Sequence, residues 1–96
     1  MEFTKEQIDA LKKKHGEVFK ITVDGKSCLL RKPNRKEMGY ASVAGKDNPL
    51  KFNEVIMNAC WLEGDEEIKT NDTLFLSASA KIADIIEVKE AELEKL

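Results

Sequence analysis

The chain has 96 residues, and 16 Lys and Arg against 18 Asp and Glu give it a formal net charge of −2. This length favours one domain, and the 42% hydrophobic content argues against a disordered chain. No apolar run approaches the roughly 20 residues that cross a bilayer, and residues 1–4 lack the apolar start of a signal peptide. We therefore expect a cytoplasmic protein that does not enter a membrane.

The charge is unevenly distributed along the chain. Residues 1–36 contain ten basic and five acidic side chains, a balance of +5, whereas residues 37–96 contain six and thirteen, a balance of −7. Two solvated surfaces of opposite bias are the simplest interpretation. The same charge asymmetry also allows two copies of the chain to pair head to tail, or the acidic part to bind a basic partner.

The first predicted element is a helix over residues 5–15. Thr4 and Gln7 have the spacing of a capping box, in which each side chain bonds to the other residue's backbone N–H. A run of basic residues at the opposite end suits the helix dipole, and Gly16 follows as a stop signal.

A β-hairpin is predicted over residues 17–32. Asp24-Gly25 is the signature of a two-residue type I′ turn, which fixes the pairing of the flanking strands. Ile21 then lies opposite Cys28, and Phe19, Ile21, Cys28 and Leu30 share one face. Because a lone hairpin is unstable, we expect this face to pack on helices.

Three further helices are predicted over residues 35–45, 49–62 and 71–86. Asn34 with Glu37, Asn48 before Pro49, and either Thr70 or Asn71 provide their starting signals. Apolar residues cover most of the circumference of 49–62, so this segment is the expected central helix. Residues 66–71 are expected to form a loop.

The predicted fold class is therefore α+β, in one domain over residues 1–96. An N-terminal helix and a β-hairpin come first, and three to four helices then pack on one face of the hairpin. Apolar residues recur only thinly in residues 88–96. The sequence leaves open whether this segment continues the preceding helix or forms one of its own.

The residues that usually perform catalysis or bind metals are few. Cys28 and Cys60 fall on predicted core faces, and His15 ends a basic helix. Reactive thiols favour exposed electropositive sites, and these three residues have no metal-ligand spacing. We therefore predict no catalytic residue, no metal site and no cofactor, and we interpret the acidic run 65–67 as a solvated loop.

A basic segment, residues 31–36, raises the alternative of nucleic-acid binding. Such modules usually have a strongly basic isoelectric point or stacking aromatics, whereas this chain has an isoelectric point of about 5.5. Nucleic-acid binding is therefore the less favoured alternative. Arg31 and Arg35 flank Pro33 and suit the binding of carboxylates within the protein.

A series of short motifs runs along nearly the whole chain. In order they are Arg31-x-Pro33-x-Arg35, Asp47-x-Pro49-Leu50, Cys60-Trp61-x-x-Gly64-Asp65, Asp72-x-Leu74-Phe75 and Ile86-Glu87-Val88-Lys89. With the capped helix and hairpin before them, they resemble the tail assembly chaperones encoded by long-tailed phages and prophages.

This resemblance implies an α+β or mostly helical protein without cofactors, in the cytoplasm of a bacterial host. It also implies that the chain binds the aggregation-prone tape-measure protein while the tail tube polymerises, and leaves before the virion matures. Some members of this family are extended by a programmed frameshift, which a protein sequence does not reveal. The alternative from the residues is a self-associating interaction module, a homo-oligomer, with another partner.

The residues predicted to contact a protein partner are aromatic, apolar or basic. The core is the favoured place for Trp61, whose neighbours are apolar, but tryptophan is also a common interface anchor. The apolar residues near the C-terminus exceed what a small core covers. The predicted contact residues are Arg31, Arg35, Trp61, Val88, Leu93 and Leu96.

Overall fold

The order of helices and strands confirms the predicted α+β class. The computed structural model describes residues 2–86 and 91–96. Its elements are α1 (Lys5–His15), β1 (Val18–Val23), β2 (Lys26–Arg31), α2 (Arg35–Ala44), α3 (Pro49–Cys60), β3 (Trp61–Gly64), α4 (Glu67–Thr70), α5 (Asp72–Ser79) and α6 (Ile82–Ile85).

The hairpin has the predicted register. Ile21 lies opposite Cys28, and Phe19 lies opposite Leu30. Asp24 and Gly25 both have positive φ, 49° and 77°, as a type I′ turn requires. The predicted turn and strand pairing are therefore confirmed.

A third strand is present where the sequence predicted the end of a helix. The helix expected over 49–62 ends at Cys60, and Trp61 has the extended angles φ −62° and ψ 125°. β3 then pairs antiparallel with β2, giving the strand order β1-β2-β3. The prediction failed because a short apolar run fits a buried helix and a buried strand equally well.

Gly64 allows β3 to approach β2. A Cβ atom at this position would lie 2.5 Å from the Cα atom of Cys28 and 2.7 Å from the carbonyl oxygen of Ser27. The obstructing atoms belong to the neighbouring strand's backbone, so they have little freedom to move. The Gly64→Ala variant should therefore lower the free energy of unfolding by about 1–3 kcal/mol in a urea titration. Gly39→Ala is the control, because a Cβ there meets open space.

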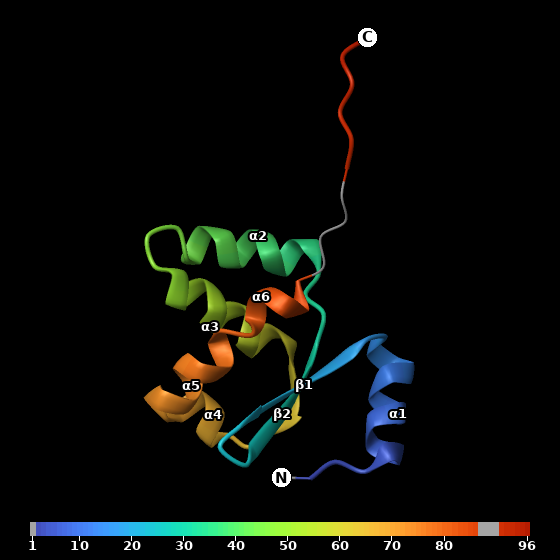
Figure 1. Cartoon of the computed structure of the whole chain (residues 1–96), viewed down its shortest axis with the longest axis vertical. Coiled ribbons are helices and arrows are strands. Elements are labelled where there is room, and N and C mark those ends of the chain that lie inside the picture. Colours follow the sequence, from blue (N-terminus) through green and yellow to red (C-terminus); the bar gives the residue numbers. More distant parts are fainter. Residues whose placement is uncertain (1, 87–90) are drawn as a thin grey trace.

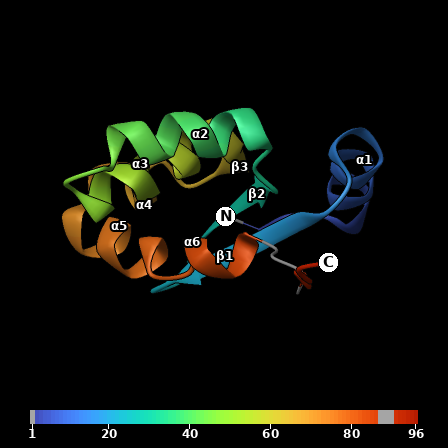
Figure 2. The same ribbon diagram turned by 90° about the horizontal axis from the view of Figure 1, so that it is seen from above.

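Helices cover the apolar face of the hairpin, as predicted. Figures 1 and 2 show α2, α3, α5 and α6 gathered on one side of the hairpin, with α1 on the other. Most of the buried residues form one cluster that joins the sheet to these helices: Ile21, Cys28, Leu30, Ala41, Ile56, Met57, Cys60, Ile68, Ala78, Ile82 and Ile85. By contrast, α1 contributes no buried residue.

The segment after β3 differs from the prediction in two places. The short helix α4 lies within the expected loop 66–71, and the expected helix 71–86 is broken between α5 and α6. The Ser79 hydroxyl donates a hydrogen bond to the Leu76 carbonyl at the end of α5, and the Lys81 N–H bonds to the Ala78 carbonyl. Such short-range bonds compete with the regular helical ladder and favour its end.

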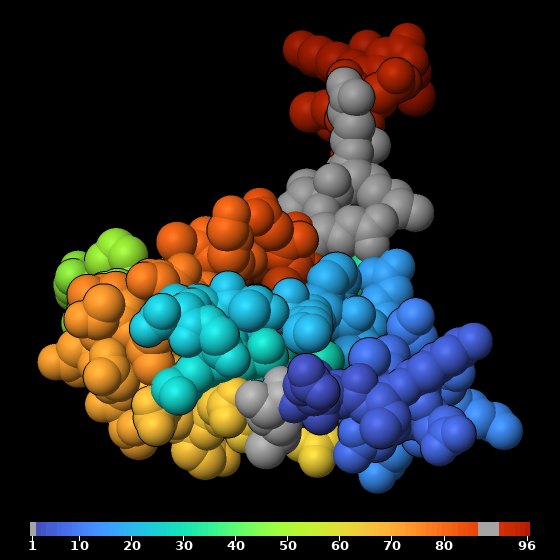
Figure 3. Space-filling view, turned by 60° about the horizontal axis from the view of Figure 1, so that its bottom comes forward, coloured from blue at the N-terminus to red at the C-terminus, as the bar shows by residue number. Residues whose placement is uncertain are grey.

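The possible C-terminal helix over residues 88–96 is absent from residues 91–96, the part of this segment that the structure describes. Residues 91–96 have no regular secondary structure and are exposed. Figure 3 shows them, in red, standing away from the rest of the molecule. Residues 87–90, with Val88, lie outside the described part of the chain. Over that part, none of the helices has the length and apolar character that crossing a membrane requires.

Candidate protein-binding surface

Arg31, at the end of β2, joins three elements through its guanidinium group. Its two terminal nitrogens donate to the two carboxylate oxygens of Glu37 on α2, at 2.8 and 2.5 Å. One of them also donates to the carbonyl oxygen of Ala59 on α3, at 2.8 Å. Both side chains of the ion pair are less than a quarter exposed. Arg31 therefore binds a carboxylate within the protein, as its place beside Pro33 indicated.

The same bonds set the electrostatics of this cluster. The hydrogen bonds from Arg31 lower the pKa of Glu37, and burial only partly opposes this effect. The Glu37 carboxylate also accepts the backbone N–H of Asn34, which completes the predicted capping box of α2. The other predicted basic contact, Arg35, lies exposed at the first position of α2.

Trp61 is half-buried and packs against the core from β3. It pairs with Leu30 in the sheet, next to Arg31. The ammonium nitrogen of Lys69, on α4, lies 4.2 Å from the centroid of the indole ring. This cation–π contact engages one side of the ring. Arg31 and Trp61 therefore lie near one another. Leu93 and Leu96 belong instead to residues 91–96, the red segment that Figure 1 shows extending away from the helices and strands.

An open depression, which we call the α3–α5 groove, lies between α3, α4 and α5. It has a volume of about 380 Å³ and is lined by three apolar residues and three charged ones: Leu50, Phe75, Leu76, Glu54, Lys69 and Asp72. Leu50 and Leu76 are large apolar side chains, yet they are 45% and 50% exposed. The sequence did not predict this groove, because Leu50 falls in the segment 49–62 that was expected to form the buried central helix.

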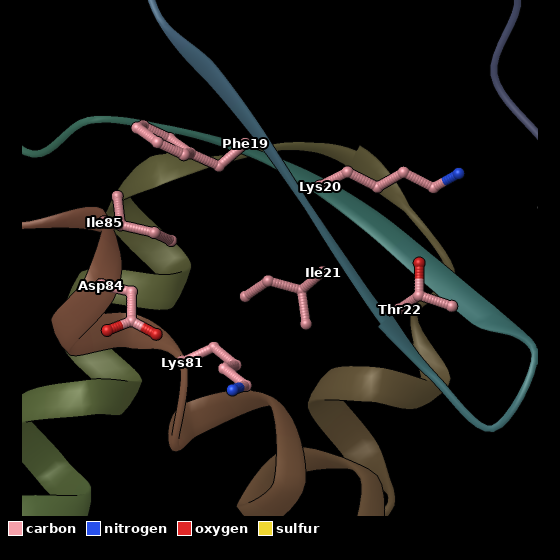
Figure 4. Close-up of a pocket in the computed structure, with 7 residues that line it drawn as sticks. All are labelled: Phe19, Lys20, Ile21, Thr22, Lys81, Asp84 and Ile85. Atoms are coloured by element: carbon pink, nitrogen blue, oxygen red, sulfur yellow. The ribbon is translucent and has the colours of Figure 1, made fainter.

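A second depression, which we call the β1-edge pocket, runs along β1 beside α6. It encloses about 280 Å³. Figure 4 shows the side chains of Phe19 and Ile21 on the α6 side of the strand, with Lys20 and Thr22 directed away from it. The pocket is lined by Phe19, Lys20, Ile21, Thr22, Lys81, Asp84 and Ile85.

Both cysteines are free thiols buried in the core. Burial raises the pKa of Cys28 and of Cys60 to about 11, because the thiolate is poorly solvated there. Neither thiol is therefore activated as a nucleophile at neutral pH.

Because of these buried thiols, the free energy of unfolding should depend on pH in the alkaline range. In the unfolded chain they ionise near pH 9, and in the folded protein near pH 11. A pKa raised by folding contributes stability that is present below pH 9 and lost as the pH rises through 11. The Cys28→Ala variant should therefore show a smaller loss of stability between pH 9 and 11 than the unchanged protein, measured by urea titrations. An equal loss in both proteins would show that the Cys28 thiol makes no such contribution.

Among the described residues, no group of three or more His, Cys, Asp and Glu side chains is placed to hold a metal ion. No protein-family model, curated protein or solved structure matches the chain.

Proposed function

We propose that this chain is a non-enzymatic protein that binds another polypeptide through the α3–α5 groove. The observation that carries the proposal is the exposure of Leu50 and Leu76 at a depression already lined by Phe75. Isolated exposed leucines are ordinary on a protein surface, but two of them gathered at one depression, with charged residues around them, are typical of partner binding.

The chemistry of the groove favours a helical, apolar partner segment. Burial of a leucine side chain in such a site contributes about 1.5–3 kcal/mol. The charged residues Glu54, Lys69 and Asp72 lie around the apolar ones. They would complement a partner that has both basic and acidic side chains beside its apolar face. An amphipathic helix meets both requirements, because residues at i, i+3 and i+4 share one face.

The motif resemblance identifies a tape-measure protein as the partner to test. Such a protein is long and aggregation-prone, so a small protein that covers its apolar segments would keep it soluble during tail assembly in the bacterial cytoplasm. The chain would act as a tail assembly chaperone. A self-associating module that binds another partner is the alternative, and a failure of tape-measure binding would favour it.

The test is binding of tape-measure fragments to groove variants of the full chain. Leu50→Asp and Leu76→Asp should each weaken binding by about tenfold or more, because a charge replaces a buried apolar contact. Leu50 lies in the first turn of α3, where an acidic side chain favours the helix. The variant should therefore remain folded, which circular dichroism verifies.

The matched control is Val43→Asp. Val43 is 80% exposed on α2 and lies outside the α3–α5 groove. Its replacement adds the same charge and should change the affinity less than twofold, the scale of an exposed charge. Equal weakening by all three substitutions, or no weakening by the two groove variants, would contradict the groove as the binding site.

The predicted contribution of the C-terminal segment is tested separately. Leu93 and Leu96 are fully exposed, whereas Val88 lies outside the described residues. Deleting residues 88–96 should leave the core intact, because the described part of this segment contributes nothing to it. If the segment contacts the tape-measure protein, the deletion should weaken binding, while the melting temperature stays the same at protein concentrations low enough to exclude self-association. Full binding without it would exclude it as a contact surface.

The nucleic-acid alternative gains no support from the arrangement of the basic segment. Arg31 is engaged by Glu37 and the Ala59 carbonyl, so the segment does not present all its cations to a phosphate backbone. A heparin column provides the check, since a protein of this charge should elute at low salt.

A further inference from the structure

β1 has one unpaired edge among the described residues, since it is the first strand in the order β1-β2-β3. Val23 and Lys26 flank the two-residue turn, so they form a hydrogen-bonded pair. Hydrogen-bonded and non-bonded pairs alternate along an antiparallel ladder, so the backbone groups of Ile21 and Phe19 also bond to β2. The N–H and C=O groups of the alternate residues, Lys20 and Thr22, therefore point outward from the sheet edge.

The two faces of this edge differ in chemistry. On the helix side, the β1-edge pocket is lined by half-buried Phe19, by Ile21 and Ile85, which are almost fully buried, and by the charged residues Lys81 and Asp84. On the other side, Lys20 and Thr22 are exposed, and Lys20 carries a positive charge (Figure 4). A strand that paired here would require apolar residues on one face and acidic residues on the other.

Residues 91–95 of the chain have this pattern. Their sequence is Ala-Glu-Leu-Glu-Lys, in which small, apolar and basic side chains alternate with two glutamates. The structure gives them no helix, and Leu93 is fully exposed. An alternating segment with a fully exposed leucine matches an unpaired strand rather than an amphipathic helix.

We propose that β1 accepts residues 91–95 of a second copy of this chain as an additional strand. Placing Leu93 beside Ile21 fills the β1-edge pocket with an apolar side chain. Because side chains alternate along a strand, Glu92 and Glu94 then lie on the face of Lys20, for either direction of the added strand. Their carboxylates complement the Lys20 ammonium group.

The geometry and the charges together select a second copy as the occupant. Residues 91–96 stand away from the body of their own molecule, so they are accessible to another one (Figures 1 and 3). Pairing of two β1 strands would instead bring two Lys20 side chains together on one face, which like-charge repulsion opposes. When each copy supplies its segment to the other, the contact closes as a symmetric dimer.

Sedimentation velocity of the full chain, up to millimolar concentration and without a tape-measure fragment, tests the proposal. The unchanged protein should self-associate. The Leu93→Asp variant should associate about tenfold more weakly or worse, because the β1-edge pocket then receives a charge. Leu96→Asp is the matched control, since position 96 falls on the opposite face from Leu93 and should change association less than twofold.

Exchanging the charges of Lys20 and the two glutamates tests whether β1 is the surface that binds the added strand. Lys20→Glu should weaken association about threefold, and combining it with Glu92→Lys and Glu94→Lys should restore it. Lys20 is exposed, so its replacement should not unfold the protein. A monomer at every concentration, equal effects of the Leu93 and Leu96 substitutions, or failure of the charge exchange would overturn the proposal.

Discussion

Replacing Ile56 with alanine should lower the free energy of unfolding by about 2–5 kcal/mol. Ile56 lies on α3 and is 0% exposed, within the cluster that joins the sheet to the helices. Its truncation removes buried apolar surface and leaves a cavity, which close-packed neighbours fill only in part. Urea unfolding at fixed pH measures the loss as a lower midpoint with an unchanged slope.

Two further variants provide a smaller truncation at the same site and a surface control for comparison. Ile56→Val removes a single methylene and should cost about 0.5–1.5 kcal/mol. Asn58→Ala changes an exposed residue of the same helix and should stay within about 0.5 kcal/mol of the unchanged protein. A loss below about 0.5 kcal/mol for Ile56→Ala would place this side chain at the surface, and α3 would not be the central helix.

Replacing Arg31 with alanine should cost about 2–4 kcal/mol, the second large effect. The variant removes both charge-assisted bonds to Glu37 and the bond to the Ala59 carbonyl. It also leaves the Glu37 carboxylate mostly buried without its partner, which is more costly than loss of an exposed ion pair. Urea titration measures the loss, and Arg35→Ala, an exposed arginine four residues later, is the matched control.

The pH dependence of stability separates this ion pair from simple packing. The pKa of Glu37 lies below its ordinary value of 4.5, so its carboxylate contributes stability above that pH. This stability is lost as the pH falls through the lowered pKa in the folded protein. In the Glu37→Gln variant the acid-side loss should be smaller. If both proteins lose stability equally between neutral pH and pH 3, Glu37 is not held ionised by Arg31.

Local sequence signals predicted the elements whose geometry depends on neighbouring residues. The capping boxes of Thr4 with Gln7 and of Asn34 with Glu37 both form. The Asp24-Gly25 turn fixes the hairpin register in the same way. In each case the groups that interact lie within a few residues of one another, so the pattern in the sequence contains the whole interaction.

The features that the sequence did not predict depend on contacts between distant segments. β3 exists because residues after Cys60 meet an open edge of β2, and Gly64 gives the room to approach it. The bond from Arg31 to Ala59 joins residues 28 positions apart. The α3–α5 groove likewise requires the relative placement of three helices, which periodicity within one helix does not specify.

Methyl-resolved NMR of the protein with a tape-measure fragment tests the central claim most directly. The account predicts chemical-shift changes and intermolecular contacts at the methyl groups of Leu50 and Leu76. Leu29 is 1% exposed in the sheet and provides an internal control that should not contact the fragment. Binding that perturbs only Leu93 and Leu96, or no binding at all, would contradict the claim that the α3–α5 groove holds another polypeptide.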